Sequence, residues 1–478
     1  MEFANPIVRL RLSHIYQKGE SMKVVFPTRL LAPRYRDIDA KDVRFRDYDG
    51  AIVASMTVPE ARALEALPAL PSHPGLVCQG WNWSLDELHN LTHPADVGAH
   101  FITDDGKTRL YMVIPAGDTN PVPLEISYNG KLHVDWGDGS EPHVEEPEEE
   151  LEEDELWPTW ELSHTYPTTD KDAQYVITVW SEGGSVRFGQ SDWDWGNYNI
   201  FGQFDLQKRE SYRRLKAVEF GNITGSYRKM LFYFCDGIQT VTMPNNVTEF
   251  EAAVFSSCES LRHVTLPAGI DTIQGSTFST NKGLVAVSIP NGVVHLGGDV
   301  FLGCTSLTRL CLGDTVDFIG ITPFQNIGVG YLRLPPGPKS LQKDCFLYAK
   351  NLSHVSLPRG ITTMGDYCFY GCESLAEVDI PEGVSVIPVY CFTGCKLLQR
   401  VNFPSTVTDI RGAAFRTDAK SPMLVLDFRA ARQVPTLSDT DGENRVTKVI
   451  VPDALYDDWK EANNWKSYGS KIVKVSAA

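Results

Sequence analysis

The sequence predicts a mainly β protein in which a small α+β module and a β-sandwich precede a long solenoid of repeats. A spacing of about 23 residues recurs through the second half, apolar and polar residues alternate around residues 132–140, and strand and helix signals mix near the N-terminus. With 478 residues, 42% of them hydrophobic, the chain is long enough for more than one core. We therefore divide it into a module (1–107), a sandwich (108–186), a junction with an N-terminal cap (187–212), a solenoid (213–450) and a C-terminal cap (451–478).

The N-terminal module is indicated by one strand and one helix. Residues 43–53 alternate like a strand that enters a turn, and Thr57 is a suitable N-cap for a helix with an early proline, which we expect to continue through Leu67. Trp81 and Trp83 could form a platform for a sugar ring. The favoured interpretation is that they form the core of this module.

The sandwich is predicted from three short motifs: residues 132–140 (LHVDWGDGS), 163–166 (SHTY) and 175–179 (YVITV). The Asp138-Gly139 pair suits a tight turn between strands. These motifs resemble polycystic-kidney-disease-type domains, and the resemblance implies an immunoglobulin-like β-sandwich. Asp135 and Asp138 could bind a cation, but turn formation through hydrogen bonds to backbone amides is favoured.

An acidic insertion interrupts the sandwich motifs at residues 141–161. It holds eleven carboxylates and no Lys or Arg, and without it the formal net charge of −17 becomes −6. A solvated loop is the favoured interpretation over a dedicated site for a cation or a basic partner. The acidic balance disfavours nucleic acid as a partner, because phosphate binding needs clustered Lys and Arg.

The segment after the sandwich is aromatic and is predicted to pack the junction with the first repeat. Its aromatic residues are Trp193, Trp195, Tyr198 and Phe201. A repeat array needs a cap at each end, because its terminal units would otherwise expose an apolar face.

The solenoid is predicted from the near-constant distance between the residues that open each unit. These residues are Ile238, Leu261, Leu284, Leu307, Val329, Leu352, Leu375 and Leu398, separated by 23 residues except for one step of 22 at Val329. Within a unit, the first three apolar positions alternate like a short strand that a proline ends, and a later Ile and Phe fill the layer behind it. Each unit depends on its neighbours for a core.

Eight of the ten cysteines recur at two positions of the repeat. Those in the first register are Cys235, Cys258, Cys304, Cys372 and Cys395, and those in the second are Cys345, Cys368 and Cys391. A zinc site would need four converging ligands, and a ladder of disulfides is geometrically possible. Packing as reduced thiols in a buried column is the favoured interpretation.

The repeat L-x-x-V-x-L-P-x-x-V-x-x-I-x-x-x-x-F-x-x-C-x-S resembles the bacterial BspA-like leucine-rich repeats. Residues 352–374 fit it closely, and residues 261–283 fit it loosely, with Asn281 and Gly283 at the Cys and Ser positions. The resemblance implies a curved array with one short parallel strand per unit, found mostly in cell-surface and host-associated proteins that bind proteins or extracellular matrix. It implies no catalytic residue. The end of the chain, with Trp459 and Trp465, resembles the segment that caps such arrays.

Candidate ligand-binding residues are those that flank the second apolar position of each strand, because they share one face of the array. From Arg309 onward, the candidates are Arg309, Tyr331, Arg333, His354, Glu377, Asp379, Arg400 and Asn402. Arg309, Tyr331, Arg333 and His354 would form a positive, aromatic patch beside the acidic pair Glu377 and Asp379. Such mixtures are typical of protein-recognition surfaces, although ordinary solvated polar residues are an equal alternative.

The chain carries no recognisable catalytic, phosphate-binding or metal motif. We expect no enzyme activity, no catalytic residue, no metal and no cofactor. No apolar run reaches the about eighteen residues of a membrane span, and residues 1–21 lack the apolar core of a secretory signal.

Two functions remain for the sequence as a whole. The first is recognition or adhesion, in which the array binds a protein or glycan on a cell or host surface. The alternative is a structural or receptor-binding component of a phage tail or similar particle, which would explain the missing signal. An extracellular, cell-surface or virion-associated location follows from either, and the oligomeric state is left open.

Overall fold

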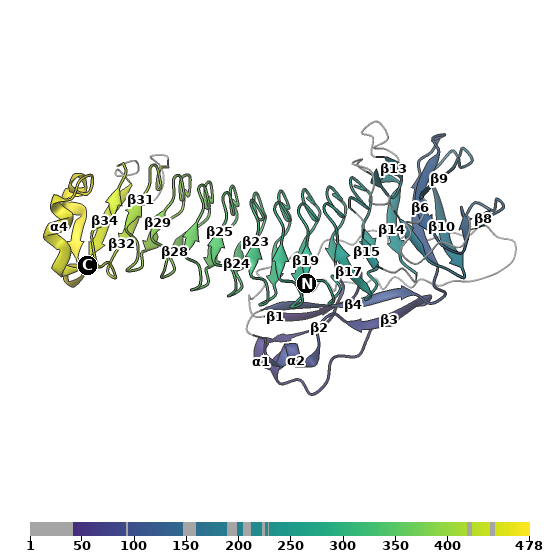
Figure 1. Ribbon diagram of the computed structural model, residues 1–478, viewed down its shortest axis with the longest axis horizontal. Helices are drawn as coiled ribbons and strands as arrows, with labels where there is room; N and C mark the ends of the chain where they lie inside the picture. The colour runs from purple at the N-terminus through teal and green to yellow at the C-terminus, as the bar shows by residue number, and fades with distance from the viewer. Residues whose placement is uncertain are drawn as a thin grey trace, which may run out of the picture.

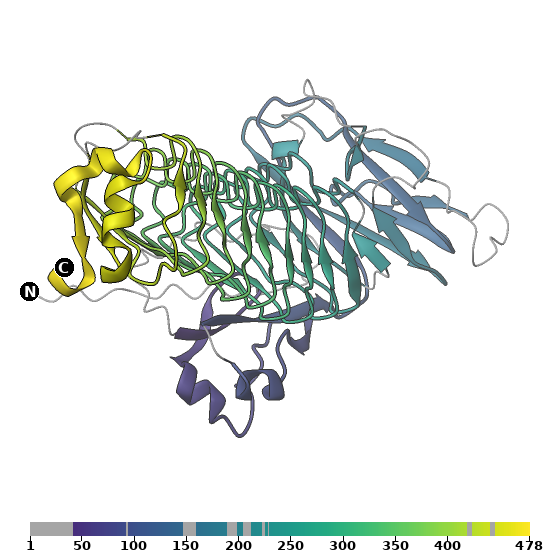
Figure 2. The ribbon, with the colours of Figure 1, turned by 60° about the vertical axis from the view of Figure 1, so that its left-hand side comes forward.

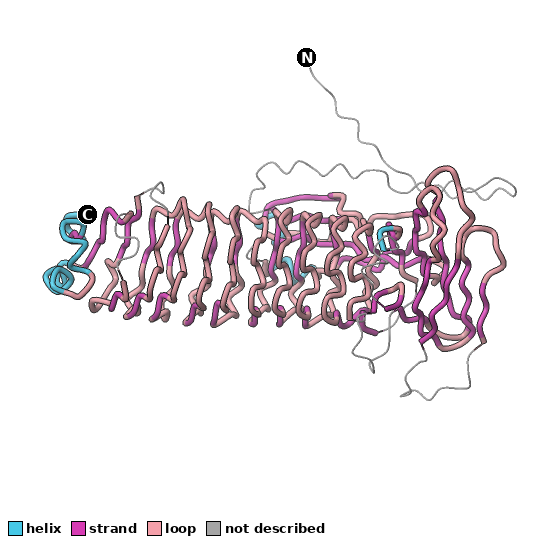
Figure 3. Tube along the Cα trace, turned by 90° about the horizontal axis from the view of Figure 1, so that it is seen from above, coloured by secondary structure: helices cyan, strands magenta, loops and turns pink. Residues whose placement is uncertain are grey.

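The computed structural model describes residues 42–91, 94–146, 159–188, 198–203, 212–221, 225–227, 229–417, 423–439 and 445–478. The described chain forms a rod in which the repeats stand side by side in a nearly straight row, rather than the curved array that the resemblance implies (Figures 1 and 3). The sandwich lies at one end, helices close the other end, and the N-terminal module lies along the first half of the row (Figure 1). The fold is mainly β, with 8% helix, which confirms the predicted fold class.

The N-terminal module is a four-stranded sheet with two short helices on one face. Its elements are β1 (Asp42–Arg46), β2 (Ile52–Thr57), α1 (Val58–Arg62), β3 (Leu76–Trp81), α2 (Leu85–His89) and β4 (Ala95–Thr103). The strand order is β2-β1-β4-β3, with β1 and β4 parallel. Ala61 and Leu88 of the helices pack with Phe45 and Val97 of the sheet. The other face of β1 and β4 is therefore left for a different partner.

The predicted helix begins as expected but ends at Arg62, so its predicted extent to Leu67 is wrong. A capping box closes its first turn. The Leu64 carbonyl accepts a hydrogen bond from His89 Nε2 of α2, at 2.8 Å. Leu67 precedes a proline, which disfavours the helical conformation there.

The tryptophan pair lies in the core of the module, as the favoured interpretation predicted. Trp83 is fully buried, and Trp81 packs edge-on against Phe45 with a centroid distance of 5.1 Å. The Trp81 Nε1–H donates to the Pro68 carbonyl at 3.0 Å. Neither ring is presented as a flat platform for a sugar.

The sandwich consists of two antiparallel sheets. One contains β5 (Thr108–Ile114), β7 (Lys131–Asp135), β8 (His143–Glu145) and β10 (Ala173–Glu182), and the other contains β6 (Val122–Tyr128), β9 (Thr159–His164) and β11 (Val186–Phe188). Leu110 and Ile177 from the first sheet and Leu124 and Ile126 from the second are fully buried between them. The predicted bounds of the acidic insertion, 141–161, are too wide, because residues 143–145 form β8, which pairs with β7, and residues 159–161 belong to β9, which pairs with β6. Residues 147–158 lie outside the described residues.

The sandwich and the solenoid share a sheet at their junction. Strand β14 (Leu215–Glu219) pairs antiparallel with β5 of the sandwich and parallel with the next solenoid strand, β16 (Thr240–Val241). Phe201, between β12 (Tyr198–Asn199) and β13 (Gly202–Gln203), is buried and stacks on Tyr212. Trp193 and Trp195 lie outside the described residues. The exposed edge of the first unit is thus covered by a sandwich strand.

Each repeat contributes two short strands to two parallel ladders, not the single strand that the resemblance implies. After β14 and β16, the first ladder contains β18 (His263–Val264), β20 (Ala286–Ile289), β22 (Arg309–Leu312), β24 (Tyr331–Arg333), β26 (His354–Ser356), β28 (Glu377–Asp379), β30 (Arg400–Asn402), β32 (Leu424–Asp427) and β34 (Val446–Val451). The second contains β15 (Gly225–Tyr227), β17 (Val247–Phe250), β19 (Thr272–Ile273), β21 (His295–Leu296), β23 (Phe318–Ile319), β25 (Ser340–Leu341), β27 (Thr363–Met364), β29 (Val386–Ile387), β31 (Asp409–Ile410) and β33 (Thr436–Leu437). Regular strand pairing is interrupted between β16 and β18, β22 and β24, and β26 and β28 in the first ladder, and between β23 and β25 and β27 and β29 in the second. The period shortens to 22 residues at one of these interruptions, before β24.

The repeat-opening residues and the two cysteine registers line the interior, as predicted. All eight openers and all eight repeat cysteines are fully buried. All ten cysteines of the chain are free thiols. In the first register, Cys372 Sγ donates to the Phe346 carbonyl of the preceding unit at 3.1 Å, and Cys258, Cys304 and Cys395 repeat this bond. These four thiols therefore pack in the interior and donate to backbone carbonyls of the preceding units.

A continuous stack of phenylalanines runs beside the cysteines. Phe346, Phe369 and Phe392 stack with centroid distances of 5.1 and 5.5 Å. The stack extends from Phe232 to Phe415. The buried rings thus form an apolar contact between each unit and the next.

Four short helical elements and a last strand cover the far end of the array. They are η2 (Asp453–Leu455), α4 (Tyr456–Glu461), η3 (Trp465–Lys471), β35 (Ile472–Lys474) and η4 (Val475–Ala477). Trp459 and Trp465 are fully buried and lie 4.8 and 5.5 Å from the ring of Phe428. β35 adds a parallel strand to β34, so the last unit exposes no bare apolar face.

Candidate recognition surface

The first ladder presents two rows of outward side chains, which we call the strand face. The register aligns His263 with Ala286 and Ala286 with Arg309, and further along it aligns Glu377 with Arg400. Neighbouring positions in a row are separated by about 4.8 Å. The side chains predicted to bind a ligand do lie in these rows.

The N-terminal module covers the first part of the strand face. Strand β4 runs along β20 and β22, and the module lies against this side of the rod (Figures 1 and 2). The outward residues on these strands, and the one directly after β18, are buried. They are His263, Thr265, Ala286, Ser288, Arg309 and Cys311. We call this part the covered strand face and the remainder, from β24 to β34, the open strand face.

Docking of the module depends on alternate residues of β4. The Asp96 carboxylate accepts from Arg309 Nε at 2.7 Å and from Arg46 Nε of its own module at 2.8 Å. His100 Nδ1–H donates to the Met243 carbonyl at 3.0 Å. Gly98 lies against Thr265 so closely that a methyl group at Gly98 would come within 2.3 Å of it.

The docked interface is buried, and a carboxylate paired with two arginines lies within it. Burial opposes ionisation of Asp96, yet Arg309 and Arg46 together outweigh it and hold the pKa of the carboxyl below its usual value. Burial lowers the pKa of His100 to about 4. Burial, with a further contribution from Arg46, lowers the pKa of His263 to about 4. Both imidazoles are therefore neutral near pH 7.

The structure corrects the expected role of Arg309. Its side chain is 6% exposed and paired with Asp96, so it does not belong to an exposed patch with Tyr331 and Arg333. This contact could not be predicted from the alternation alone, because Asp96, Gly98 and His100 alternate with apolar residues, as the residues of a solvated strand face do. The small or polar character of these three residues was the feature of the sequence that could have indicated the contact.

Tyr331, Arg333 and His354 form one cluster on the open strand face. The rings of Tyr331 and His354 are in register and stack in parallel, with a centroid distance of 5.4 Å. Tyr331 is 42% exposed. Arg333 Nη1 donates to Asp314 Oδ1 at 2.9 Å, so this cation is held beside the stacked rings.

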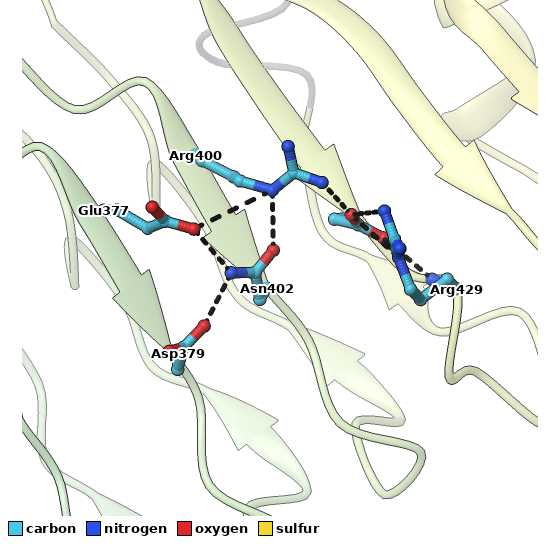
Figure 4. Close-up of polar contacts among 6 residues, drawn as sticks. Glu377, Asp379, Arg400, Asn402 and Arg429 are labelled. Carbon is cyan, nitrogen blue, oxygen red and sulfur yellow. Dashed lines mark hydrogen bonds and ion pairs between the residues drawn. The ribbon is translucent and has the colours of Figure 1, made fainter. Parts of the chain in front are cut away.

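Glu377, Asp379, Arg400 and Asn402 form a second, connected cluster (Figure 4). Asn402 Nδ2 donates to Glu377 at 2.8 Å and to Asp379 at 2.6 Å, and its Oδ1 accepts from Arg400 Nε at 2.8 Å. Arg400 also bonds Asp427, which is shared with Arg429 (Figure 4). The structure thus brings together seven of the eight predicted residues in two clusters.

Asp427, Arg429 and Lys448 extend the open strand face and were missed from the sequence. Val425 and Asp427 continue the rows of Arg400 and Asn402, and Lys448 follows Val425. The distances between units become irregular after residue 398, so the repeat spacing alone did not identify these positions. Extending the outward rows from β30 to the next paired strands, β32 and β34, would have identified these three residues.

The predicted turn role of Asp135 and Asp138 is confirmed. Asp135 Oδ1 accepts from the Gly137 amide at 2.9 Å, and Asp138 Oδ1 accepts from the Ser140 amide at 3.0 Å. Asp138 Oδ2 also accepts from His164 Nε2 at 2.7 Å. Both carboxylates are thereby engaged by the protein itself.

Neither a group of three potential metal ligands nor a helix able to cross a membrane occurs among the residues that the structure describes.

Comparison with known proteins identifies the repeats. Residues 210–329 and 318–421 match the family described as BspA type Leucine rich repeat region, in six copies. The predicted resemblance is confirmed for this region, and no catalytic family is indicated. Among curated proteins no significant match was found.

Several solved structures are similar to the chain. A leucine-rich repeat protein from Bacteroides ovatus is 15% identical over 62% of this chain and 96% of its own, with a TM-score of 0.34. A leucine rich cell surface protein from Faecalibacterium prausnitzii is 17% identical over 52% and 73%, with a TM-score of 0.31. The pneumococcal vaccine antigen PcpA is 14% identical over 56% and 82%, with a TM-score of 0.33.

Proposed function

We propose that this chain is a non-enzymatic recognition protein whose open strand face binds a protein on another surface. The observation that carries the proposal is the division of the strand face. One part is buried under the N-terminal module, while the part from Tyr331 onward is exposed and carries stacked rings with ordered charges. A binding partner would therefore meet the second half of the array.

The composition of the open strand face favours a protein partner over a glycan. Tyr331, Arg333 and Arg400 are residue types enriched at protein-binding hot spots. Hydrogen bonds already orient Arg400 and Asn402, so little side-chain entropy is lost when a partner binds them. Charges of both signs lie within one surface, which suits a partner with a complementary pattern.

We also propose an extracellular or cell-surface location, which the BspA-type match supports because such repeats occur mostly in surface proteins. For the sandwich we propose the polycystic-kidney-disease type. Support comes from the contacts of its motif: the Tyr166 hydroxyl donates to the Trp136 carbonyl at 2.8 Å, and the Trp136 and His164 rings stack. The domain boundaries given above are retained as part of this proposal.

A binding screen against purified extracellular proteins and glycans tests the function. The test variant is Tyr331→Ala/His354→Ala, which removes both stacked rings from the open strand face. Each hot-spot side chain contributes at least about 2 kcal/mol, so affinity for the partner should fall at least about thirtyfold. Both positions are exposed, and the fold should be unaffected.

A matched control is available on the second ladder. His295 and Phe318 also form an exposed histidine–aromatic contact between adjacent units, at 5.5 Å. The His295→Ala/Phe318→Ala variant should bind the partner as the unmodified protein does. Equal loss in both variants, or no loss in the first, would refute the role of the open strand face.

A further inference from the structure

A pocket lies at the C-terminal end of the open strand face. It has a volume of about 440 Å³ and is lined by Arg400, Arg429, Lys448, Val425, Ile450 and Val475, among others. Arg400, Val425 and Lys448 are in register across β30, β32 and β34. The pocket is therefore built on the same rows as the candidate recognition surface.

Its two arginines are fixed by one buried carboxylate. Asp427 is 1% exposed and accepts from Arg429 Nε at 3.0 Å and Nη2 at 2.7 Å, and from Arg400 Nη2 (Figure 4). Burial opposes its ionisation, but Arg429 and Arg400 outweigh this effect and keep the pKa of Asp427 below its usual value. Two guanidiniums thus share a single negative charge and are held in place before any ligand binds.

Cationic donors remain available around the pocket. Within the described part of the chain, Nη1 of Arg400, Nη1 of Arg429 and Nζ of Lys448 meet no acceptor. Glu377 Oε1 lies 3.9 Å from Arg400 Nε, and the Glu377 side chain is 53% exposed. Asp427 and Glu377 supply two negative side-chain charges against the three positive side-chain charges of Arg400, Arg429 and Lys448, and the last residue, Ala478, also lines the pocket.

The floor of the pocket is aliphatic. Ile450 is 4% exposed and Val475 is 40% exposed, and Val425 lies between them and Arg400. No aromatic side chain lines the pocket, so the flat surface on which sugar rings commonly stack is missing. A ligand with a carboxylate next to an aliphatic group matches both the rim and the floor.

We infer that this pocket binds an acidic peptide segment of the protein partner, through a carboxylate held by Arg400, Arg429 and Lys448 and an aliphatic side chain seated on Val425 and Ile450. The inference rests on the proposed function, because it gives the partner's chemistry at one end of the same face. Charge complementarity selects an acidic segment, and the aliphatic floor selects peptide over acidic sugar.

The test is fluorescence anisotropy with the full chain and a labelled octapeptide of sequence Gly-Ser-Leu-Glu-Leu-Glu-Ser-Gly. The same peptide with Gln in place of Glu is the neutral control. A charge-assisted hydrogen bond contributes about 1.5–3 kcal/mol, so the Gln peptide should bind at least about tenfold more weakly. Arg429→Gln and Lys448→Gln should each weaken binding of the Glu peptide by a similar factor.

Lys466→Gln is the matched control, since it removes one exposed positive charge outside the pocket. It should leave the affinity unchanged. Lys448 forms no hydrogen bond or ion pair within the described residues, so Lys448→Gln tests the site even if Arg429→Gln disturbs Asp427. Equal binding of both peptides, or equal loss in Lys466→Gln and Lys448→Gln, would overturn the inference.

Sialyllactose is the probe for an acidic sugar. If it binds with the same dependence on Arg429 and Lys448 while the Glu peptide does not bind, the assignment to a peptide is wrong. Failure of the proposed function is a separate result, because it is measured with Tyr331→Ala/His354→Ala. A partner that depends on those two residues but not on Lys448 overturns only the pocket.

Discussion

Replacing Asp96 with Asn should release the N-terminal module from the covered strand face. The Asp96 carboxylate is fully buried and is bonded to Arg46 and Arg309, whose side chains are 2% and 6% exposed. Asn is nearly the same size but neutral. Two guanidiniums would then be buried without a compensating charge, which is the costly way to break an ion pair.

The magnitude follows from the geometry of this cluster. Removing one partner of a buried ion pair costs about 3–5 kcal/mol. Asn can still accept one hydrogen bond from an arginine, so we expect the lower end, about 3 kcal/mol. The equilibrium between docked and undocked states should shift about a hundredfold towards undocking.

Cys311 is the reporter for this change. It lies on the covered strand face beside Asp96, is 7% exposed, and burial raises the pKa of its thiol to about 11. Undocking exposes it without opening the solenoid. Alkylation of Cys311 by iodoacetamide, followed by mass spectrometry, should accelerate about a hundredfold in Asp96→Asn, while the interior thiol of Cys372 stays unmodified.

The control is Asp105→Asn, which removes the partner of Arg109 at 2.7 Å in an exposed ion pair. Such pairs contribute about 0–1 kcal/mol, so Cys311 should react as in the unmodified protein. If Asp96→Asn leaves the rate at Cys311 unchanged, the buried carboxylate does not hold the module. If Cys372 reacts as fast as Cys311, the solenoid has unfolded and the reasoning about docking is refuted.

Three further predictions concern the same interface and the core. Gly98→Ala should weaken docking by about 1–3 kcal/mol through its clash with Thr265, and Cys311 alkylation should accelerate. Gly269→Ala, at an exposed position with no neighbouring atom within 4 Å, should leave the rate at Cys311 unchanged. The pKa values of His100 and His263 fall to about 4 on burial from about 6.5 when exposed, so the undocked state binds more protons between these pH values. Docking should therefore be strongest above pH 6.5 and weaken as the pH falls towards 4, by about 2 kcal/mol per histidine at pH 5. A rate of β4 amide exchange that stays constant over this range, after correction for its intrinsic pH dependence, would contradict this. Phe369→Ala should cost about 3–5 kcal/mol in urea unfolding because it empties the phenylalanine stack, and a cost no larger than that of the exposed Phe318→Ala would contradict the stacking account.

The interior of the solenoid could be predicted from the sequence because its contacts repeat. A residue such as Leu352 packs against its equivalents one period before and after it. The spacing of about 23 residues therefore predicts both where each strand lies and which residues pack together. The cysteine registers and the phenylalanine stack follow from the same rule. The second strand of each unit was missed because two residues, such as Thr363–Met364, are too few for a period-two pattern.

The candidate site was only partly predictable. The rows of Tyr331, His354 and Arg400 follow from strand alternation, and the structure leaves them exposed. Nothing in the repeat distinguishes Arg309 from Arg333, since both occupy outward positions on a strand. The pocket around Asp427 lies where the spacing becomes irregular, so its residues had no repeat position by which to be recognised.

The sequence by itself determined the array and the direction of its side chains, because these depend on short-range alternation and on contacts between neighbouring repeats. Only the tertiary structure decided which part of the strand face is open. That decision rests on the pairing of Asp96 with Arg309, 213 residues apart, which has no periodic signature in the sequence. A buried ion pair between the module and the array is specified by shape and charge in three dimensions, and it covers one part of the strand face while side chains such as Tyr331 stay exposed.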